Sequence, residues 1–155
     1  MPTTKAKEIL TKYWDKTIPI DPIKLARAAG VTVKAVPNLS TSGEFKKCMV
    51  EGPLIQYRST ESDVRQRFTI AHELGHFVLG HGGAYRDNPD NFSLANHDPL
   101  EVSANRFAAE LLMPEDVLNY LVIKRGINGI AKLADMLQVS QVAMQYRLKN
   151  LGWIS

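Results

Sequence analysis

Two histidines and a glutamate stand close together in the stretch Arg67 to His81, RFTIAHELGHFVLGH. His72 and His76 are four residues apart, so on a helix they share one face and two ring nitrogens can meet one zinc ion. Glu73 follows the first histidine and lies beside that ion, where its carboxylate can take a proton from an activated water. The pattern predicts a metal site with a general base next to it.

Apolar residues surround this pattern on most sides of the expected helix, which is typical of a helix in the core. Two rows recur at helical spacing, one of them including Phe68, Ala71 and Gly75, the other Ile70 and Leu74. Buried polar side chains are costly when they have no partner. A metal ion would supply that partner for the histidines.

A catalytic zinc site takes three protein ligands and keeps a fourth position for water, so a third ligand is expected downstream. His81 suits the end of the helix, beside its partial negative charge, and His97 suits a substrate contact or a surface position. Glu101 opens the segment EVSANRFAAELLMP and is the best candidate, although a helix dipole also favours an acid in a first turn. Asn105 shares the face of Glu101 and could accept a hydrogen bond from a ligating imidazole.

Hydrophobic periodicity and end signals divide the chain into short elements. Helices are predicted over residues 4–14, 22–29, 63–79, 100–113, 115–124, 130–137 and 140–150. Strands are predicted over residues 31–36, 44–50 and 54–58, the last two as a hairpin. Residues 84–99 have the composition of a surface loop. The strand 54–58 is our candidate for an exposed edge to which an extended substrate could add.

The size and composition of the chain favour one soluble domain. Its 155 residues are 45% hydrophobic, which is enough for a core, and the net charge of +3 gives no argument for nucleic acid. The N-terminus lacks the apolar run of a signal peptide, and no stretch approaches the length of a membrane span. We therefore expect a cytoplasmic protein.

These elements predict an α+β fold. It would have a small antiparallel-type three-stranded sheet, a central metal-binding helix and a C-terminal helix-turn-helix-like pair. We expect a single domain over residues 1–155, with a core at 1–114 and a helical extension at 115–155. The basic residues of that pair are Lys132, Arg147 and Lys149. We expect most of its apolar residues, Val142 and Tyr146 included, to serve packing, so partner docking is favoured over direct DNA binding.

The stretch RFTIAHELGHFVLGH, followed by E-x-x-A-N-R-F-A-A-E-L-L-M-P, resembles the ImmA/IrrE family of zinc metallopeptidases. The resemblance extends to PIDPIKLARAAGVTV near the start and LADMLQVSQVAMQYRLKNLGW at the end. It implies a zincin-like core in which His72, His76 and Glu101 hold one Zn²⁺ and Glu73 is the catalytic base. By analogy with gluzincins, Asn105 would orient His72.

The same resemblance implies an intracellular endopeptidase. Its substrate would be a DNA-binding regulator, either an Xre-type helix-turn-helix repressor of a phage or mobile element or an antitoxin-like partner. His97, Tyr85 and Tyr57 are the candidates for stabilising the oxyanion or contacting substrate. The alternatives are a binding module that grips a regulator without cutting it, and a DNA-binding regulator with a structural metal site.

Overall fold

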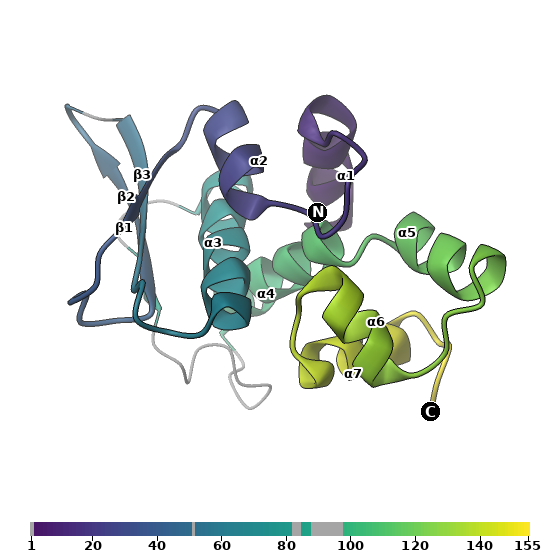
Figure 1. Ribbon diagram of the computed structural model, residues 1–155. Helices are drawn as coiled ribbons and strands as arrows, with labels where there is room; N and C mark the ends of the chain where they lie inside the picture. The colour runs from purple at the N-terminus through teal and green to yellow at the C-terminus, as the bar shows by residue number, and fades with distance from the viewer. Residues whose placement is uncertain (1, 51, 82–84, 88–97) are drawn as a thin grey trace.

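The computed structural model describes residues 2–50, 52–81, 85–87 and 98–155. A sheet lies at one side, helices run through the middle, and the C-terminal helices lie at the other side (Figure 1). The elements in chain order are α1 (Pro2–Tyr13), α2 (Pro22–Ala28), β1 (Thr32–Ala35), β2 (Gly43–Cys48), β3 (Gly52–Tyr57), α3 (Asp63–Val78), β4 (Tyr85–Asp87), α4 (Pro99–Leu112), α5 (Glu115–Asn119), a π-helical turn η2 (Tyr120–Lys124), α6 (Ile130–Leu137) and α7 (Gln141–Asn150).

Side-chain caps fix the start of the helices that matter for the site. The hydroxyl of Ser62 accepts from a backbone N–H in the first turn of α3, and the carboxylate of Asp98 does the same for α4. Asp21 caps α2, ahead of a proline at the first helical position, as its sequence predicts. Each cap satisfies N–H groups that a helix leaves without a partner. The caps thereby hold the first turns in register.

The sheet is mixed, which corrects the expectation of an antiparallel three-stranded sheet. Four strands in the described part of the chain lie in the order β1-β3-β2-β4. β2 and β3 form the expected antiparallel hairpin, with Phe45 opposite Ile55, but β1 runs parallel to β3. The chain leaves β1, forms β2 first, and returns to place β3 between the two.

This order overturns two further expectations. β3 is an inner strand, so the segment 54–58 offers no free edge to a substrate. β4 forms within the predicted loop 84–99 and pairs antiparallel with the first residues of β2. The remaining edges of the described sheet are β1 and β4.

Helix α3 packs between the sheet and α4 (Figure 1). Phe45 on β2 is fully buried and its ring lies 5.7 Å from that of Phe77 on α3. On the other side, Leu74 of α3 and Phe107 of α4 are both fully buried in the same core. Burial of such side chains contributes about 1.5–3 kcal/mol each, so the core holds α3 firmly from two sides.

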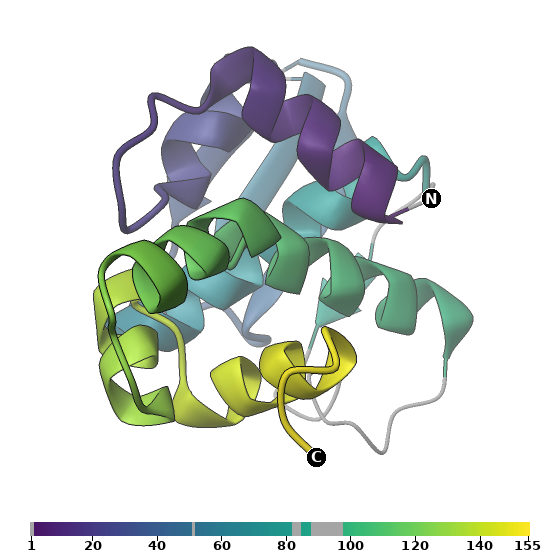
Figure 2. The same ribbon diagram turned by 90° about the vertical axis from the view of Figure 1, so that its right-hand side faces the viewer.

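The C-terminal helices lie in front of the sheet in Figure 2 and are tied to α3 and α4 by two arginines. The guanidinium of Arg67 on α3 donates to the carbonyls of Ile20 and Gln138. Arg147 on α7 is only 8% exposed and donates from Nε to the carbonyl of Met113, at 2.9 Å. Arg147 is therefore a packing residue, and its charge is not available to a phosphate backbone.

The expected packing of α7 is partly wrong. Met144 and Leu148 are buried, as periodicity predicts, but Val142 is 62% and Tyr146 is 38% exposed. These two residues lie one helical turn apart and leave an apolar strip on the surface of α7.

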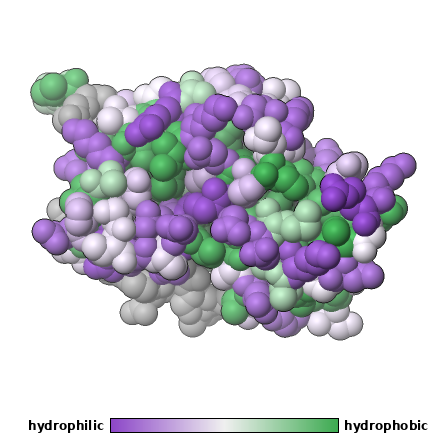
Figure 3. All heavy atoms as spheres, in the orientation of Figure 1, coloured by the Kyte–Doolittle hydropathy of each residue, from purple (hydrophilic) through white to green (hydrophobic). Residues whose placement is uncertain are grey.

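Figure 3 shows apolar surface at the end of the β2–β3 hairpin, beyond the sheet. Met49 and Val50 in that turn are almost fully exposed. A pair of apolar side chains is far smaller than the several hundred Å² that mark a binding patch. In the described ranges, no helix has the length and apolar character needed to cross a bilayer.

Candidate metal centre

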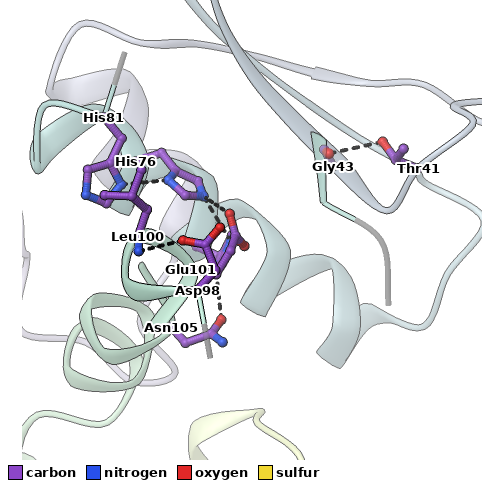
Figure 4. Close-up of polar contacts among 9 residues, drawn as sticks. Thr41, Gly43, His76, His81, Asp98, Leu100, Glu101 and Asn105 are labelled. Carbon is purple, nitrogen blue, oxygen red and sulfur yellow. Dashed lines mark hydrogen bonds and ion pairs between the residues drawn. The ribbon is translucent and has the colours of Figure 1, made fainter. Parts of the chain in front are cut away.

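Three buried side chains bring their ligand atoms together between α3 and α4. The carboxylate of Glu101 lies 3.0 Å from His72 Nε2. It lies 3.1 Å from His76 Nε2 (Figure 4). The two Nε2 atoms are 3.2 Å apart. Among the described residues, these three form the one group of such side chains with metal-binding spacing, and their ligand atoms all lie within 4.8 Å of one another.

Close packing of α3 on α4 lets Glu101 reach the histidines. A Cβ atom at Gly75 would lie 3.0 Å from the Phe107 ring and 3.3 Å from the Ala104 backbone. Gly75 is thus the residue of α3 that allows the backbone of α4 to approach. The cap at Asp98 fixes the first turn of α4, where Glu101 lies.

The imidazole of His72 is held by Asn105. Its Nδ1 lies 2.7 Å from the side-chain oxygen of Asn105, one turn beyond Glu101 on α4. Since an amide oxygen only accepts, the ring nitrogen Nδ1 donates. The lone pair of His72 is then on Nε2, which points at Glu101 and His76.

The surroundings of His76 favour its neutral form. Burial lowers its pKa below the ordinary value for histidine, and this outweighs the opposite influence of Glu101. Burial and the neighbouring His76 also lower the pKa of His81. A neutral imidazole has the free lone pair that a metal ion needs.

The residues fit a metal ion of the zinc type. In a tetrahedral site with ligand distances near 2.0–2.1 Å, neighbouring donor atoms are separated by about 3.3 Å, close to the three separations quoted above. Two neutral imidazoles and one carboxylate form a donor set that zinc accepts. The lone pairs of the two Nε2 atoms and of the Glu101 carboxylate face one another in a buried place and repel one another. A bound cation would offset this repulsion.

Glu73 follows His72 on α3 and is not a member of the donor cluster. It is fully buried, and neither of its carboxylate oxygens has a hydrogen-bond partner among the described residues. Burying a charged group in this way costs several kcal/mol. A carboxylate kept at such cost favours a role in chemistry over a role in packing.

Gly43, at the start of β2, forms the wall next to Glu73. A Cβ atom there would lie 3.3 Å from Glu73 Oε2 and 2.3 Å from Thr69 Cγ2. The carbonyl of Gly43 accepts from Thr41 Oγ1 at 3.1 Å, which fixes this stretch of backbone (Figure 4). Only glycine lets the strand approach α3 this closely.

A Gly43→Ala variant is expected to be less stable than the wild type by about 1–3 kcal/mol, because the added methyl group overlaps Thr69 Cγ2. Urea unfolding of the full chain measures the loss. Thr69→Ser is the matched background, because it removes Cγ2 and keeps the hydroxyl. The loss should shrink when Gly43→Ala is made in that background; an equal loss in both backgrounds would refute the contact.

The three residues predicted to stabilise the oxyanion or contact substrate lie in different parts of the chain. Tyr57 lies at the end of β3, half-buried, and pairs with Gly43 in the sheet. Tyr85 begins β4, and its backbone pairs with Phe45; its side chain and all of His97 lie outside the described residues. Tyr57 and Tyr85 thus lie on the two strands that flank β2, the strand that contains Gly43.

Two contacts at the site were not predicted from the sequence. His81 contacts a ring nitrogen of His76, and Gly43 forms the wall beside Glu73. Gly80, just before His81, was a sequence signal for a helix end that turns back on itself. No local signal identifies Gly43, because its neighbours come from a distant helix.

Comparison with known proteins finds relatives that are named as metalloproteases, which agrees with a metal centre at this place. A family model described as the IrrE N-terminal-like domain matches residues 26–149. The chain is 33% identical over 128 residues to the radiation response metalloprotease IrrE of Deinococcus radiodurans, covering 80% of this chain and 38% of that protein. It is 35% identical over 92 residues to the metallopeptidase ImmA of Bacillus subtilis, covering 58% of this chain and 53% of that protein.

The match to the Deinococcus deserti IrrE metalloprotease has 31% identity over 123 residues, with 77% of this chain and 43% of the relative covered. The chain therefore spans about half the length of its curated relatives, or less. The matched region contains all three gathered side chains and Glu73. On these grounds the chain belongs to the family of the IrrE N-terminal-like domain.

Proposed function

We propose that this protein is a zinc-dependent endopeptidase, a hydrolase that cleaves a cytoplasmic DNA-binding regulator. The observation that carries the proposal is the buried carboxylate of Glu73, which has no described hydrogen-bond partner and belongs to the residue that follows His72 of the His-His-Glu donor set. A site that only bound metal would not need this acid. A site that hydrolyses peptide bonds needs a base there.

His72, His76 and Glu101 would hold the zinc ion, with Asn105 fixing the ring of His72. When bound, zinc supplies Lewis acidity, which lowers the pKa of water to about 7 and polarises a peptide carbonyl. Glu73 takes a proton from the attacking water as the carbon–oxygen bond forms. It then gives that proton to the amide nitrogen as the carbon–nitrogen bond breaks, so that an acid and an amine leave.

The burial of Glu73 suits its two roles, taking a proton from water and giving it to the amide nitrogen. Desolvation raises the proton affinity of a carboxylate, so a buried glutamate is a better base than an exposed one. The wall formed by Gly43 limits the positions open to its oxygens. Tyr57, Tyr85 and His97 remain our candidates for donating to the oxyanion.

An extended substrate would add to a sheet edge by main-chain hydrogen bonds. β4 is the edge closer to the base, because it pairs with β2 at Gly43 and Phe45. We place the substrate strand along β4 and not along β3, because β3 is an inner strand. Side chains on alternate positions of the substrate would then face α3.

The regulator is proposed to be a helix-turn-helix protein, either an Xre-type repressor or an antitoxin-like partner of a phage or mobile element. Cleavage would relieve repression. We place the docking of this partner at the C-terminal helices, where Val142 and Tyr146 of α7 are exposed. Direct DNA binding is disfavoured, because Arg147, one of the three basic residues considered for it, is buried.

The test is a search for new N-termini in a soluble proteome of the source organism after incubation with the full chain. Zinc-loaded protein should produce a small set of new termini within DNA-binding regulators, and protein treated with a chelator should produce none. Zinc-loaded protein that yields no new termini, or the same termini as the chelated sample, would contradict the proposal. Such a result with tight zinc binding would favour a non-catalytic binding module.

A structural metal site is the weaker reading of the same donors. Such a site is usually closed by four protein ligands. Within the described ranges, the group contains three. A fourth position open to water is the arrangement that catalysis requires.

A further inference from the structure

The end of α3 turns back onto the helix and brings His81 beside His76. The N–H of Gly80 donates to the carbonyl of Phe77 at 3.2 Å, and the N–H of His81 donates to the carbonyl of His76 at 2.9 Å. Gly80 has φ +76°, the left-handed conformation that glycine adopts without strain. These two bonds define a Schellman motif, which commonly brings the last residue into contact with the residue five positions earlier.

The contact between these two side chains is frequently apolar in such motifs. Here it is polar: Nδ1 of His76 lies 2.8 Å from Nδ1 of His81, and the two rings are tilted by 58° with their centroids 5.0 Å apart (Figure 4). The same two residues are therefore joined twice, once through the backbone and once through the rings.

The direction of this ring contact follows from the donor cluster. Nε2 of His76 faces Glu101 and His72, so its lone pair must be there if His76 is to bind metal. The proton of neutral His76 is then on Nδ1, and that N–H donates. His81 accepts at Nδ1, which places its own proton on Nε2.

This geometry excludes His81 as a metal ligand itself. Its Nδ1 contacts the side of the His76 ring opposite to Nε2. His81 is not a member of the group of described side chains with metal-binding spacing. Its effect on the centre must therefore pass through His76.

We propose that His81 is a positioning residue that holds the ring of His76 in its metal-binding tautomer and orientation. It does for His76 what the Asn105 oxygen does for His72. Hydrogen bonds to the distal nitrogen of a ligating imidazole fix the ring and raise its basicity, and their loss costs about 10–100-fold in metal affinity. The proposal rests on the zinc site of the proposed function.

Two variants separate the hydrogen bond from ring packing. His81→Phe keeps an aromatic ring against His76 but has no acceptor. His81→Asn is smaller, but its side-chain oxygen can take the place of Nδ1 as an acceptor. If the hydrogen bond contributes to metal binding, His81→Phe should bind zinc more weakly than the wild type, and His81→Asn should regain the wild-type zinc affinity.

The experiment titrates the metal-free full chain with zinc alone, in competition with a chromophoric chelator. His81→Phe should raise the zinc dissociation constant about 10–100-fold, and His81→Asn should restore it to within about threefold of wild type. Cobalt(II) replaces zinc in a second titration, where the visible absorption bands should change shape in His81→Phe and keep the wild-type shape in His81→Asn. Urea unfolding of the metal-free proteins shows whether either change disturbs the fold.

Equal zinc affinity in His81→Phe and wild type would overturn the proposal, as would His81→Asn binding zinc as weakly as His81→Phe. Both results leave the proposed function intact, provided that the wild type binds zinc and His72→Ala does not. A wild-type protein that takes up no zinc would overturn the proposed function and this inference together.

Discussion

Replacing Glu73 by glutamine is expected to lower the rate of peptide cleavage by about 10²–10⁴-fold, the usual contribution of a general base. Glutamine has nearly the same shape, but its amide does not accept a proton near neutral pH. Because the Glu73 carboxylate is not among the gathered donor atoms, the zinc affinity should stay close to the wild-type value. The rate is measured by quantitative mass spectrometry of the new N-termini described above.

Glu115→Gln is the matched control, because it makes the same chemical change at an exposed position on α5. It should cleave at the wild-type rate. Equal cleavage by Glu73→Gln and wild type would rule out the proposed base. A Glu73→Gln protein that had lost its zinc would instead show that this carboxylate helps to bind the metal.

Replacing Glu101 by glutamine is expected to remove most of the stabilisation that zinc gives to the protein. The change deletes the one carboxylate among the three side chains of the donor cluster and leaves only the two imidazoles to hold a divalent cation. At a free zinc concentration 100 times the dissociation constant, binding stabilises a fold by about 2.7 kcal/mol. For a chain of this size that corresponds to a rise in Tm of about 5–10 °C.

Thermal unfolding with and without zinc measures this effect. The wild type and Glu115→Gln should show the full rise in Tm, and Glu101→Gln should show little of it at the same zinc concentration. An undiminished rise in Glu101→Gln would mean that zinc binds elsewhere. Because metal-free Glu101→Gln serves as its own baseline, any change in fold stability caused by the substitution is subtracted.

The features that the sequence predicts well are those set by local geometry. The helical spacing of His72 and His76 follows from 3.6 residues per turn, and the same rule places Asn105 one turn from Glu101. The caps of the helices are also local, since Asp21 satisfies N–H groups only two and three residues away. These features need no knowledge of tertiary contacts.

The order of the strands in the sheet cannot be predicted from local geometry, because strands that pair are distant in the chain. Alternation marks β1 and β3 as strands but carries no information on which of them is inner or whether they run parallel. β4 is only three residues long and lies in a stretch with the composition of a loop. Its pairing with β2 comes from the free edge of a neighbour and not from its own sequence.

The helix end and α7 illustrate two other limits. The helix dipole alone explains a histidine at the C-terminal end of α3, where His81 lies. The sequence therefore gives no indication of the contact between the rings of His81 and His76. For α7, periodicity predicts which side chains share a face, but not how far a partner element extends over that face. The exposure of Val142 and Tyr146 is set by that extent.

The measurement that tests the central claim most directly is the metal content of the freshly purified protein by inductively coupled plasma mass spectrometry, made on the wild type and on Glu101→Gln. The account predicts about one zinc ion per wild-type chain and a large loss in the variant. A wild-type protein without zinc, and with no uptake after zinc is added, would contradict it, and so would equal zinc content in the two proteins.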